Sequence, residues 1–179
     1  MTTGTFTRPA LVCNSQSGSH DDAVLAEIVE SCRTAGAPLV AVFALPDDEI
    51  PDAGELVRQD IDLLLVWTGD GTINAAATGA AGWDGAILPL PGGTLNLLSK
   101  DLHGDRPVTG ILSRGLQGKG GRQPGAMIRS DSGDAFITIV AGPATQWAEV
   151  RETMRQDGLI DASRSGPGAP HAVVDGPGV

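Results

Sequence analysis

Long apolar segments are missing from this sequence of 179 residues. No stretch approaches the roughly 18 uninterrupted apolar residues that a membrane-spanning helix needs. The first residues also lack the basic region and the apolar region that together mark a signal peptide. These absences predict a cytoplasmic protein without a transmembrane segment.

Basic residues and cysteines are few as well. Twelve Lys and Arg against 22 Asp and Glu give a formal net charge of −10, which argues against a nucleic-acid partner. The two cysteines, Cys13 and Cys32, lie in an apolar run and in a helical pattern, so we expect reduced, buried thiols and no metal site. The three histidines share no metal-ligand spacing and are expected at the surface or in turns: His20, His103 and His171. The three tryptophans are expected to pack in the core: Trp67, Trp83 and Trp147.

The negative charge is unevenly distributed. Residues 106–129 contain five Lys or Arg and no Asp or Glu, so this stretch carries +5 and the remainder −15. A solvated, glycine-rich loop is the favoured interpretation. The alternative is a patch that faces anionic lipid headgroups or phosphates, which would place the protein at the inner face of a membrane.

Short apolar runs alternate with amphipathic stretches over the first hundred residues. This alternation is typical of βαβ units and predicts an α/β fold with a Rossmann-like, doubly wound parallel sheet. The strands are expected at 10–13, 39–43, 61–67 and 86–90. The helices are expected at 21–36, with Gly36 as the stop, and at 53–58, 73–81 and 95–102.

The pattern changes after residue 110. A short helix at 111–116, a hairpin at 126–129 and 135–140, and a helix at 144–157 indicate a second, β-rich region that is incomplete. Residues 164–179 are rich in glycine and proline and are expected to form a flexible tail. We therefore predict a nucleotide-binding domain at 1–106, a partial second region at 107–163 and a tail at 164–179.

Two glycine turns carry the chemistry. The first, Thr68-Gly69-Asp70-Gly71-Thr72, joins a buried strand to a helix. Backbone without side chains lets several N–H groups approach an anion there, and the helix dipole favours its charge. Thr72 is placed to cap the helix. The alternative is an Asx turn whose glycines supply positive φ angles.

The second turn, Pro91-Gly92-Gly93-Thr94-Leu95-Asn96, has the same construction. A third polar turn, Asn14-Ser15-Gln16-Ser17-Gly18, follows the first strand. The carboxyl ends of parallel strands meet at one edge of the sheet, where open α/β sheets bind ligands. The three turns therefore predict one phosphate-binding crevice.

Together these turns resemble the motifs of the diacylglycerol kinase catalytic-domain family, which includes sphingosine kinases and bacterial lipid kinases. Residues 14–18 resemble its Asn-Pro-x-Ser-Gly turn, 68–74 its Gly-Gly-Asp-Gly-Thr-x-Asn signature and 90–96 its Pro-x-Gly-Thr-x-Asn loop. The resemblance implies an NAD kinase/diacylglycerol kinase-like first domain and a β-sandwich second domain. It further implies an ATP- and Mg²⁺-dependent kinase that phosphorylates the hydroxyl of diacylglycerol or a similar lipid at a membrane surface.

The same resemblance assigns roles by position. Asp70 becomes the catalytic candidate, either as a base or as a carboxylate associated with Mg²⁺. No residue is assigned as a direct metal ligand. The expected nucleotide-binding residues come from all three turns: Asn14, Ser17, Gly18, Gly69, Gly71, Thr72, Gly93, Thr94 and Asn96.

Three positions depart from the family pattern: Thr68 replaces a glycine, Ala75 an acidic residue and Leu97 a polar one. Ala75 and Leu97, together with the incomplete second region, motivate a second hypothesis, a nucleotide-binding module that is truncated or inactive. A third, a kinase of the NAD-kinase or phosphofructokinase type, shares the Gly-Gly-Asp-Gly turn but not the Pro-x-Gly-Thr-x-Asn loop, and ranks below the other two.

Overall fold

The computed structural model of the chain describes residues 6–17, 20–117, 128–130 and 133–135. Four parallel strands form one sheet in the order β2-β1-β3-β4. Their bounds are Pro9–Asn14 for β1, Ala41–Leu45 for β2, Leu63–Thr68 for β3 and Ala86–Pro91 for β4. The predicted α/β fold with a parallel sheet is thus confirmed.

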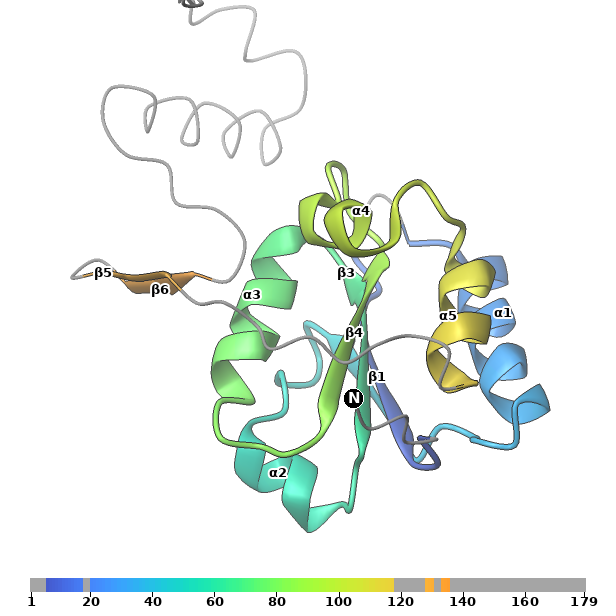
Figure 1. Cartoon of the computed structure of the whole chain (residues 1–179), viewed down its shortest axis with the longest axis horizontal. Helices are drawn as coiled ribbons and strands as arrows, with labels where there is room; N and C mark the ends of the chain where they lie inside the picture. Colours follow the sequence, from blue (N-terminus) through green and yellow to red (C-terminus); the bar gives the residue numbers. More distant parts are fainter. Residues whose placement is uncertain (1–5, 18–19, 118–127, 131–132, 136–179) are drawn as a thin grey trace, which may run out of the picture. The chain divides into compact units, whose positions relative to one another are not determined.

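Helices cover both faces of this sheet (Figure 1). On one face lie α1 and α5, at Asp22–Thr34 and Val108–Leu116, and on the other lie α2 and α3, at Ala53–Arg58 and Asp70–Gly79. A further short helix, α4, spans Leu97–His103 after β4. A sheet covered on both faces needs apolar side chains on both, which explains the uninterrupted apolar runs of β1 and β3.

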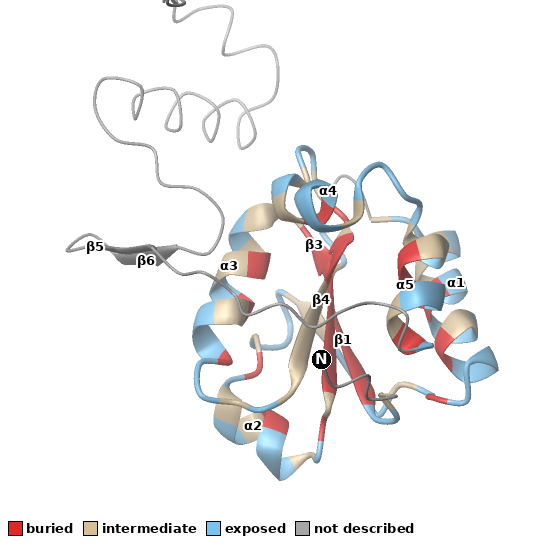
Figure 2. Cartoon of the chain, viewed as in Figure 1, coloured by how far each residue is buried: buried red, intermediate tan, exposed pale blue. Residues whose placement is uncertain are grey.

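The core has two halves, one on each face of the sheet, because successive strand residues point to opposite sides. Figure 2 shows β1 and β3 as the most deeply buried strands. One half joins odd-numbered residues of β1 and β3, such as Leu11 and Leu65, to Ile28 of α1 and Leu112 of α5. The other half joins even-numbered residues of β1 and β3 to α2 and α3; it includes Val12, Leu64, Val66, Leu56 and Ile73.

Local signals bound the first two helices, and the predicted stop at Gly36 is one of them. Asp21 caps α1 by accepting a hydrogen bond from the backbone N–H of Ala23. Gly36 has a φ of 77° directly after the end of that helix, a conformation that favours glycine. Asp52 caps α2 through the N–H of Glu55.

Some predicted boundaries are wrong by two or three residues. Strand β3 begins at Leu63 rather than at Ile61, because Asp60 turns the chain with a φ of 54° before it. Helix α3 begins at Asp70 rather than at Ile73. The remaining shifts are of similar size: β2 lies at 41–45, α4 at 97–103 and α5 starts at 108.

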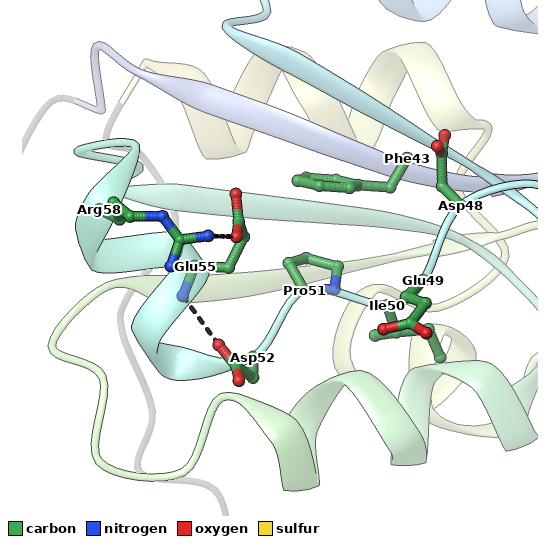
Figure 3. Close-up of a pocket in the computed structure, with 8 residues that line it drawn as sticks. All are labelled: Phe43, Asp48, Glu49, Ile50, Pro51, Asp52, Glu55 and Arg58. Carbon is green, nitrogen blue, oxygen red and sulfur yellow. Dashed lines mark hydrogen bonds and ion pairs between the residues drawn. The ribbon is translucent and has the colours of Figure 1, made fainter.

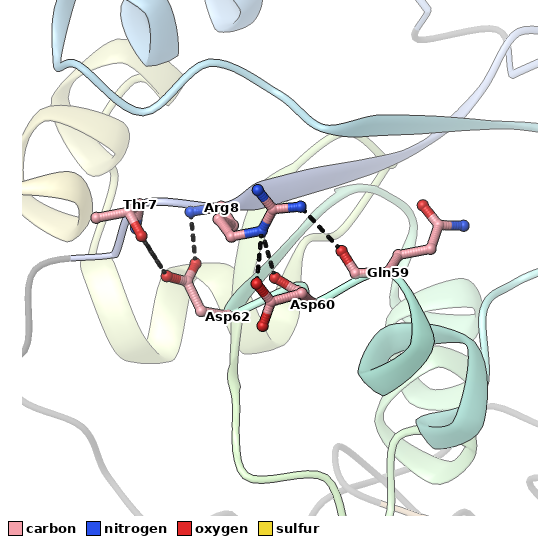
Figure 4. Close-up of polar contacts among 5 residues, drawn as sticks. All are labelled: Thr7, Arg8, Gln59, Asp60 and Asp62. Atoms are coloured by element: carbon pink, nitrogen blue, oxygen red, sulfur yellow. Dashed lines mark hydrogen bonds and ion pairs between the residues drawn. The ribbon is translucent and has the colours of Figure 1, made fainter.

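The amino edge of the sheet is closed by a polar cluster of Thr7, Arg8, Gln59, Asp60 and Asp62 (Figure 4). The Asp62 carboxylate accepts from the N–H groups of Thr7 and Arg8 at 2.8 and 3.0 Å, and from the Thr7 hydroxyl at 3.2 Å. Arg8 donates to the backbone oxygens of Asp60 and Gln59 and forms an ion pair with the Asp60 carboxylate at 3.1 Å. The cluster fixes the entry into β1 against the entry into β3.

Beyond α5, the structure describes only a short antiparallel pair, β5 at Ile128–Ser130 and β6 at Gly133–Ala135, inside the predicted hairpin. The predicted helix at 144–157 and tail at 164–179 lie outside the described residues. Helix α5 lies beyond residue 106 yet packs in the core described above, and the three-part domain division stays a prediction.

Among the described residues, no helix is long and apolar enough to cross a membrane.

Candidate nucleotide phosphate site

The three predicted turns begin at one level of the sheet. Strand register aligns Cys13 of β1 with Trp67 of β3, and Trp67 with Leu90 of β4. The residues that follow these three are Asn14, Thr68 and Pro91, so each turn starts one position beyond an aligned row. The topology therefore brings the three turns to the carboxyl edge of neighbouring strands, as the crevice hypothesis requires.

Glycines let the two glycine turns touch through their backbones. A Cβ atom on Gly93 would lie 2.5 Å from the Cα of Gly69, and one on Gly92 would lie 2.7 Å from the backbone nitrogen of Thr68. Any side chain at these two positions would force the turns apart, since a backbone cannot rotate out of the way as a side chain can. The glycines at 92 and 93 thus serve close approach.

The first turn proves to be the start of a helix. Gly69 is the N-cap of α3 with extended backbone at φ −80° and ψ 165°, and Asp70 and Gly71 are already helical. Positive φ is found at other glycines of the described residues, so the alternative of an Asx turn with positive-φ glycines is wrong. The prediction of Thr72 as the cap is wrong too, because the cap position is Gly69 and no side chain closes it.

This start leaves backbone donors at the carboxyl edge. The N–H groups of Thr72 and Ile73 both donate to the Gly69 carbonyl at 3.1 Å. The N–H groups of Asp70 and Gly71 donate to no acceptor among the described residues. Two adjacent unpaired donors at the positive end of a ten-residue helix form an arrangement that suits a phosphate oxygen.

The second turn is closed by Asn96. Its side-chain oxygen accepts from the Gly93 N–H at 2.7 Å, and its side-chain nitrogen donates to the Gly93 carbonyl at 2.9 Å. Asn96 itself has the left-handed φ of 55°, which asparagine tolerates better than most residues. The Gly93 N–H is therefore taken, and Thr94 and Leu95 are the exposed residues of this turn.

Asp70 connects the two glycine turns. Its carboxylate oxygen Oδ1 accepts from the backbone N–H of Leu98, in the first turn of α4, at 3.3 Å. Helix α4 has no side-chain cap of its own, because the side chain of its N-cap residue, Asn96, bonds to Gly93. Asp70 therefore supplies from α3 the acceptor that α4 lacks.

The third turn is ordered by Asn14, whose side chain accepts from the Gln16 N–H at 3.0 Å. The Asn14 carbonyl accepts from the N–H of Ser17 at 3.1 Å, and Ser15 donates to the Leu45 carbonyl at the end of β2. Gly18, also expected in the nucleotide site, lies outside the described residues. The residues of this turn that the structure describes are thus held at the same edge of the sheet.

Trp67 and His20 are the residues that sequence reasoning missed at this edge. Trp67 is only 4% exposed, which confirms a packing role, but its indole Nε1–H also donates to the Pro91 carbonyl of the second turn at 3.2 Å. The His20 ring lies 5.3 Å from the Trp67 ring, and the His20 side chain is 15% exposed. Trp67 therefore contacts Pro91 of the second turn and the ring of His20. Its place as the last apolar residue before Thr68 is the sequence feature that could have indicated this position.

The positions that depart from the family pattern lie around the same turns. Thr68 is fully buried, and its hydroxyl donates to the next carbonyl at 3.3 Å. Ala75 is exposed on α3, and Leu97 is 44% exposed at the start of α4. Two apolar side chains thus face solvent close to the glycine turns.

A separate hollow of about 330 Å³ lies between Phe43 of β2, the loop after that strand and α2 (Figure 3). Its lining includes four carboxylates, of Asp48, Glu49, Asp52 and Glu55, and a single cation, Arg58. Glu55 pairs with that arginine, while Asp48 and Asp52 accept backbone N–H groups. An acidic lining repels phosphate, so this hollow does not suit a nucleotide.

Both cysteines are buried free thiols, as predicted. Burial raises the pKa of the Cys32 thiol to about 11, and burial followed by the charge of Asp48 raises the pKa of Cys13. Burial, then the nearby Arg106, lowers the pKa of His103 in α4. Its Nε2 atom is buried without a hydrogen-bond partner among the described residues.

One group at the glycine turns, the Asp70 carboxylate, is of the kind that holds Mg²⁺ beside nucleotides. Within the residues that the structure describes, no three His, Cys, Asp or Glu side chains gather as a metal cage. Magnesium beside nucleotides commonly takes one or two carboxylates together with phosphate oxygens and water. Asp70 offers such a carboxylate, and its contact with Leu98 uses only one of its acceptor positions.

Comparison with known proteins supports the interpretation of the turns. Residues 8–121 match the model of the diacylglycerol kinase catalytic domain. A crystal structure of a diacylglycerol kinase from Bacillus anthracis str. Sterne is similar, with a TM-score of 0.58 and 21% identity over 88% of this chain and 55% of that one. A second structure from the same organism, whose protein also carries the name diacylglycerol kinase, gives a TM-score of 0.59 and 20% identity over 86% and 55%.

At these identities the solved structures show the fold alone, and the chain spans about half the length of either. No curated protein matches the chain. The family match covers β1 to α5 and contains all three turns, which is well over half of the sequence. The chain belongs to the diacylglycerol kinase catalytic-domain family.

Proposed function

We propose that this chain binds ATP at the carboxyl edge of its sheet and serves as the nucleotide-binding part of an ATP-dependent lipid kinase. The observation that carries the proposal is the pair of glycine turns in backbone contact, with the free N–H groups of Asp70 and Gly71 beside them. Phosphoryl transfer relies mainly on positioning and charge neutralisation, and such an arrangement offers both.

In the proposed site each turn has a part. Gly69, Gly71 and Thr72 at the start of α3 would hold phosphates, with Gly93, Thr94 and Asn96 opposite them. Asn14, Ser17 and Gly18 would line the remaining side of the nucleotide pocket. When bound, Mg²⁺ would neutralise phosphate charge, and Asp70 is the residue that would hold it directly or through water.

The reaction would join the oxygen of a lipid hydroxyl to the γ-phosphorus of ATP and break the bond from that phosphorus to the bridging oxygen, which leaves with ADP. The hydroxyl proton needs an acceptor, and Asp70 is the candidate carboxylate. The substrate proposed is diacylglycerol or a lipid of similar hydroxyl chemistry.

A second candidate, a nucleotide-binding module without catalysis, is favoured by one specific observation. Ala75 and Leu97, which take the place of polar residues in the family pattern, leave exposed apolar groups beside the glycine turns. In this alternative Asp70 holds structure and no lipid is phosphorylated.

The family match makes the third hypothesis, a kinase of the NAD-kinase type, unnecessary.

The deciding experiment supplies the 179-residue chain with Mg²⁺ and labelled ATP in mixed micelles of diacylglycerol, a sphingoid base or another hydroxylated lipid. Label transfer to one lipid class, abolished in Asp70→Asn, is expected of the kinase. Calorimetric ATP binding without transfer to any lipid would favour the binding module. Failure to bind ATP with or without Mg²⁺ would overturn both.

A further inference from the structure

The hydrogen bond from the Leu98 N–H to the Asp70 carboxylate spans 28 residues and joins the two glycine turns. We propose that Asp70 is a positioning residue, whose Oδ1 atom holds the 91–96 turn and α4 in place against the start of α3. The inference rests on the proposed function in one respect: the paired turns are taken to be the phosphate site. It adds to Asp70 a role that does not depend on charge.

The 91–96 turn behaves as one unit that must be attached to the sheet. Asn96 closes it internally through both bonds to Gly93. Its attachments to the sheet and to α3 include the backbone contacts of Gly92 and Gly93 with Thr68 and Gly69, the bond from the Trp67 indole to the Pro91 carbonyl, and the bond from Leu98 to Asp70. Of these, the bond to Asp70 lies just beyond the far end of the turn.

The third attachment also answers a need of α4. The first N–H groups of any helix lack intrahelical acceptors, and the side chain of the N-cap residue commonly supplies one. In α4 that side chain belongs to Asn96 and is bound to Gly93. Removal of the Asp70 oxygen would therefore free both the Leu98 N–H and the end of the turn.

An amide and a carboxylate differ in charge but share an oxygen that can accept this hydrogen bond. Asp70→Asn therefore keeps the attachment and removes the charge, whereas Asp70→Ala removes both. A role through charge alone predicts the same behaviour for the two variants. A positioning role predicts that they differ, with Asp70→Asn rescuing what Asp70→Ala loses.

The first measurement is calorimetric binding of ATP by the full chain in EDTA, so that magnesium plays no part. Asp70→Ala is expected to bind at least about fivefold more weakly than Asp70→Asn, since the 91–96 turn loses its far attachment. Equal binding by the two variants, within twofold, overturns the inference.

The second measurement needs no nucleotide. The Trp67 indole N–H, bonded to Pro91, gives an NMR signal that reports the position of the 91–96 turn, and Trp67→Phe assigns it. This signal should shift and exchange faster with solvent in Asp70→Ala but not in Asp70→Asn. An unchanged signal in Asp70→Ala overturns the inference even if ATP does not bind, which would separately overturn the proposed function.

Loss of folding in Asp70→Ala would obscure both readouts. Asp70→Ser then replaces Asp70→Ala. The serine hydroxyl oxygen lies one bond closer to the backbone than the carboxylate oxygens of aspartate, and the hydroxyl keeps the site polar. The same differences from Asp70→Asn are expected, and the same absence of difference counts against the inference.

Discussion

The two edges of the parallel sheet use polar groups in opposite ways. At the amino edge, the Asp62 carboxylate accepts three hydrogen bonds from Thr7 and Arg8. The Arg8 side chain in turn donates to the backbone oxygens of Asp60 and Gln59 (Figure 4). At the carboxyl edge, the N–H groups of Asp70 and Gly71 have no acceptor among the described residues. A closed polar network stabilises a fold, whereas open donors are available to a ligand.

The difference follows from backbone direction. Parallel strands present helix starts at their carboxyl edge, where N–H groups are unpaired, and that is where ligands of such sheets bind. Substitutions at the carboxyl edge should therefore alter binding most, and those at the amino edge should alter stability. The predictions that follow test this division.

The largest effect is expected for Gly93→Ala. The new Cβ would lie 2.5 Å from the Gly69 Cα, so the turns must separate. We expect a loss of about 2–3 kcal/mol in the free energy of unfolding. We also expect at least about tenfold weaker ATP binding, which corresponds to about 1.4 kcal/mol. Denaturant titration and calorimetry measure the two effects.

Gly110→Ala is the matched control, because a Cβ there meets only Pro107 at 3.7 Å, an ordinary contact, within helix α5. Replacing a helical glycine by alanine should raise stability by up to about 1 kcal/mol and leave ATP binding unchanged. If Gly93→Ala bound ATP as well as this control does, the contact between the turns would have no part in the site.

The second effect belongs to the amino edge. Asp62→Ala removes the acceptor of three hydrogen bonds, and we expect a loss of about 1–2 kcal/mol in the free energy of unfolding, measured by urea titration. Asp62→Asn, which keeps one acceptor oxygen, should lose less. ATP binding by either folded variant should match that of the unmodified chain, and weaker binding would break the division between the edges.

A smaller, pH-dependent effect is expected at His103. Burial and the charges of Arg106 and Arg114 lower its pKa below the ordinary 6.5, although the Pro89 carbonyl opposes the shift. The unfolded chain therefore takes up the proton first, and stability should fall as pH drops through about 6.5. Urea titrations at pH 7.5 and 5.5 should show a smaller fall for His103→Gln, and an equal fall would exclude His103 as the cause.

The smallest effect concerns the thiols, where no change is expected in the folded state. Cys13 and Cys32 are 2% and 0% exposed, and burial raises the pKa of both. A disulfide reagent at pH 8 should titrate neither thiol in the native chain and both after unfolding, because the thiolate is the reactive form. Rapid labelling of Cys13 in the native chain would show that the carboxyl end of β1 opens readily.

Much of the fold could be predicted because its signals are local. Asp21, Gly36 and Asp52 bound helices through their own neighbours, and the apolar runs of β1 and β3 indicate strands covered on both faces. The start of α3 was predicted three residues late. Glycines at the N-cap and in the first turn are weak helix formers, so the local pattern places the start of this helix only at Ile73.

The sequence by itself determined the parallel α/β architecture and the presence of three turns at one edge, since periodicity and motif order are properties of the chain. Tertiary structure alone decided how those turns meet. The approach of Gly93 to Gly69, the link from Trp67 to Pro91 and the bond from Leu98 to Asp70 join residues more than 20 positions apart. Such contacts depend on strand order and register, which place distant backbones side by side and leave no mark in local sequence.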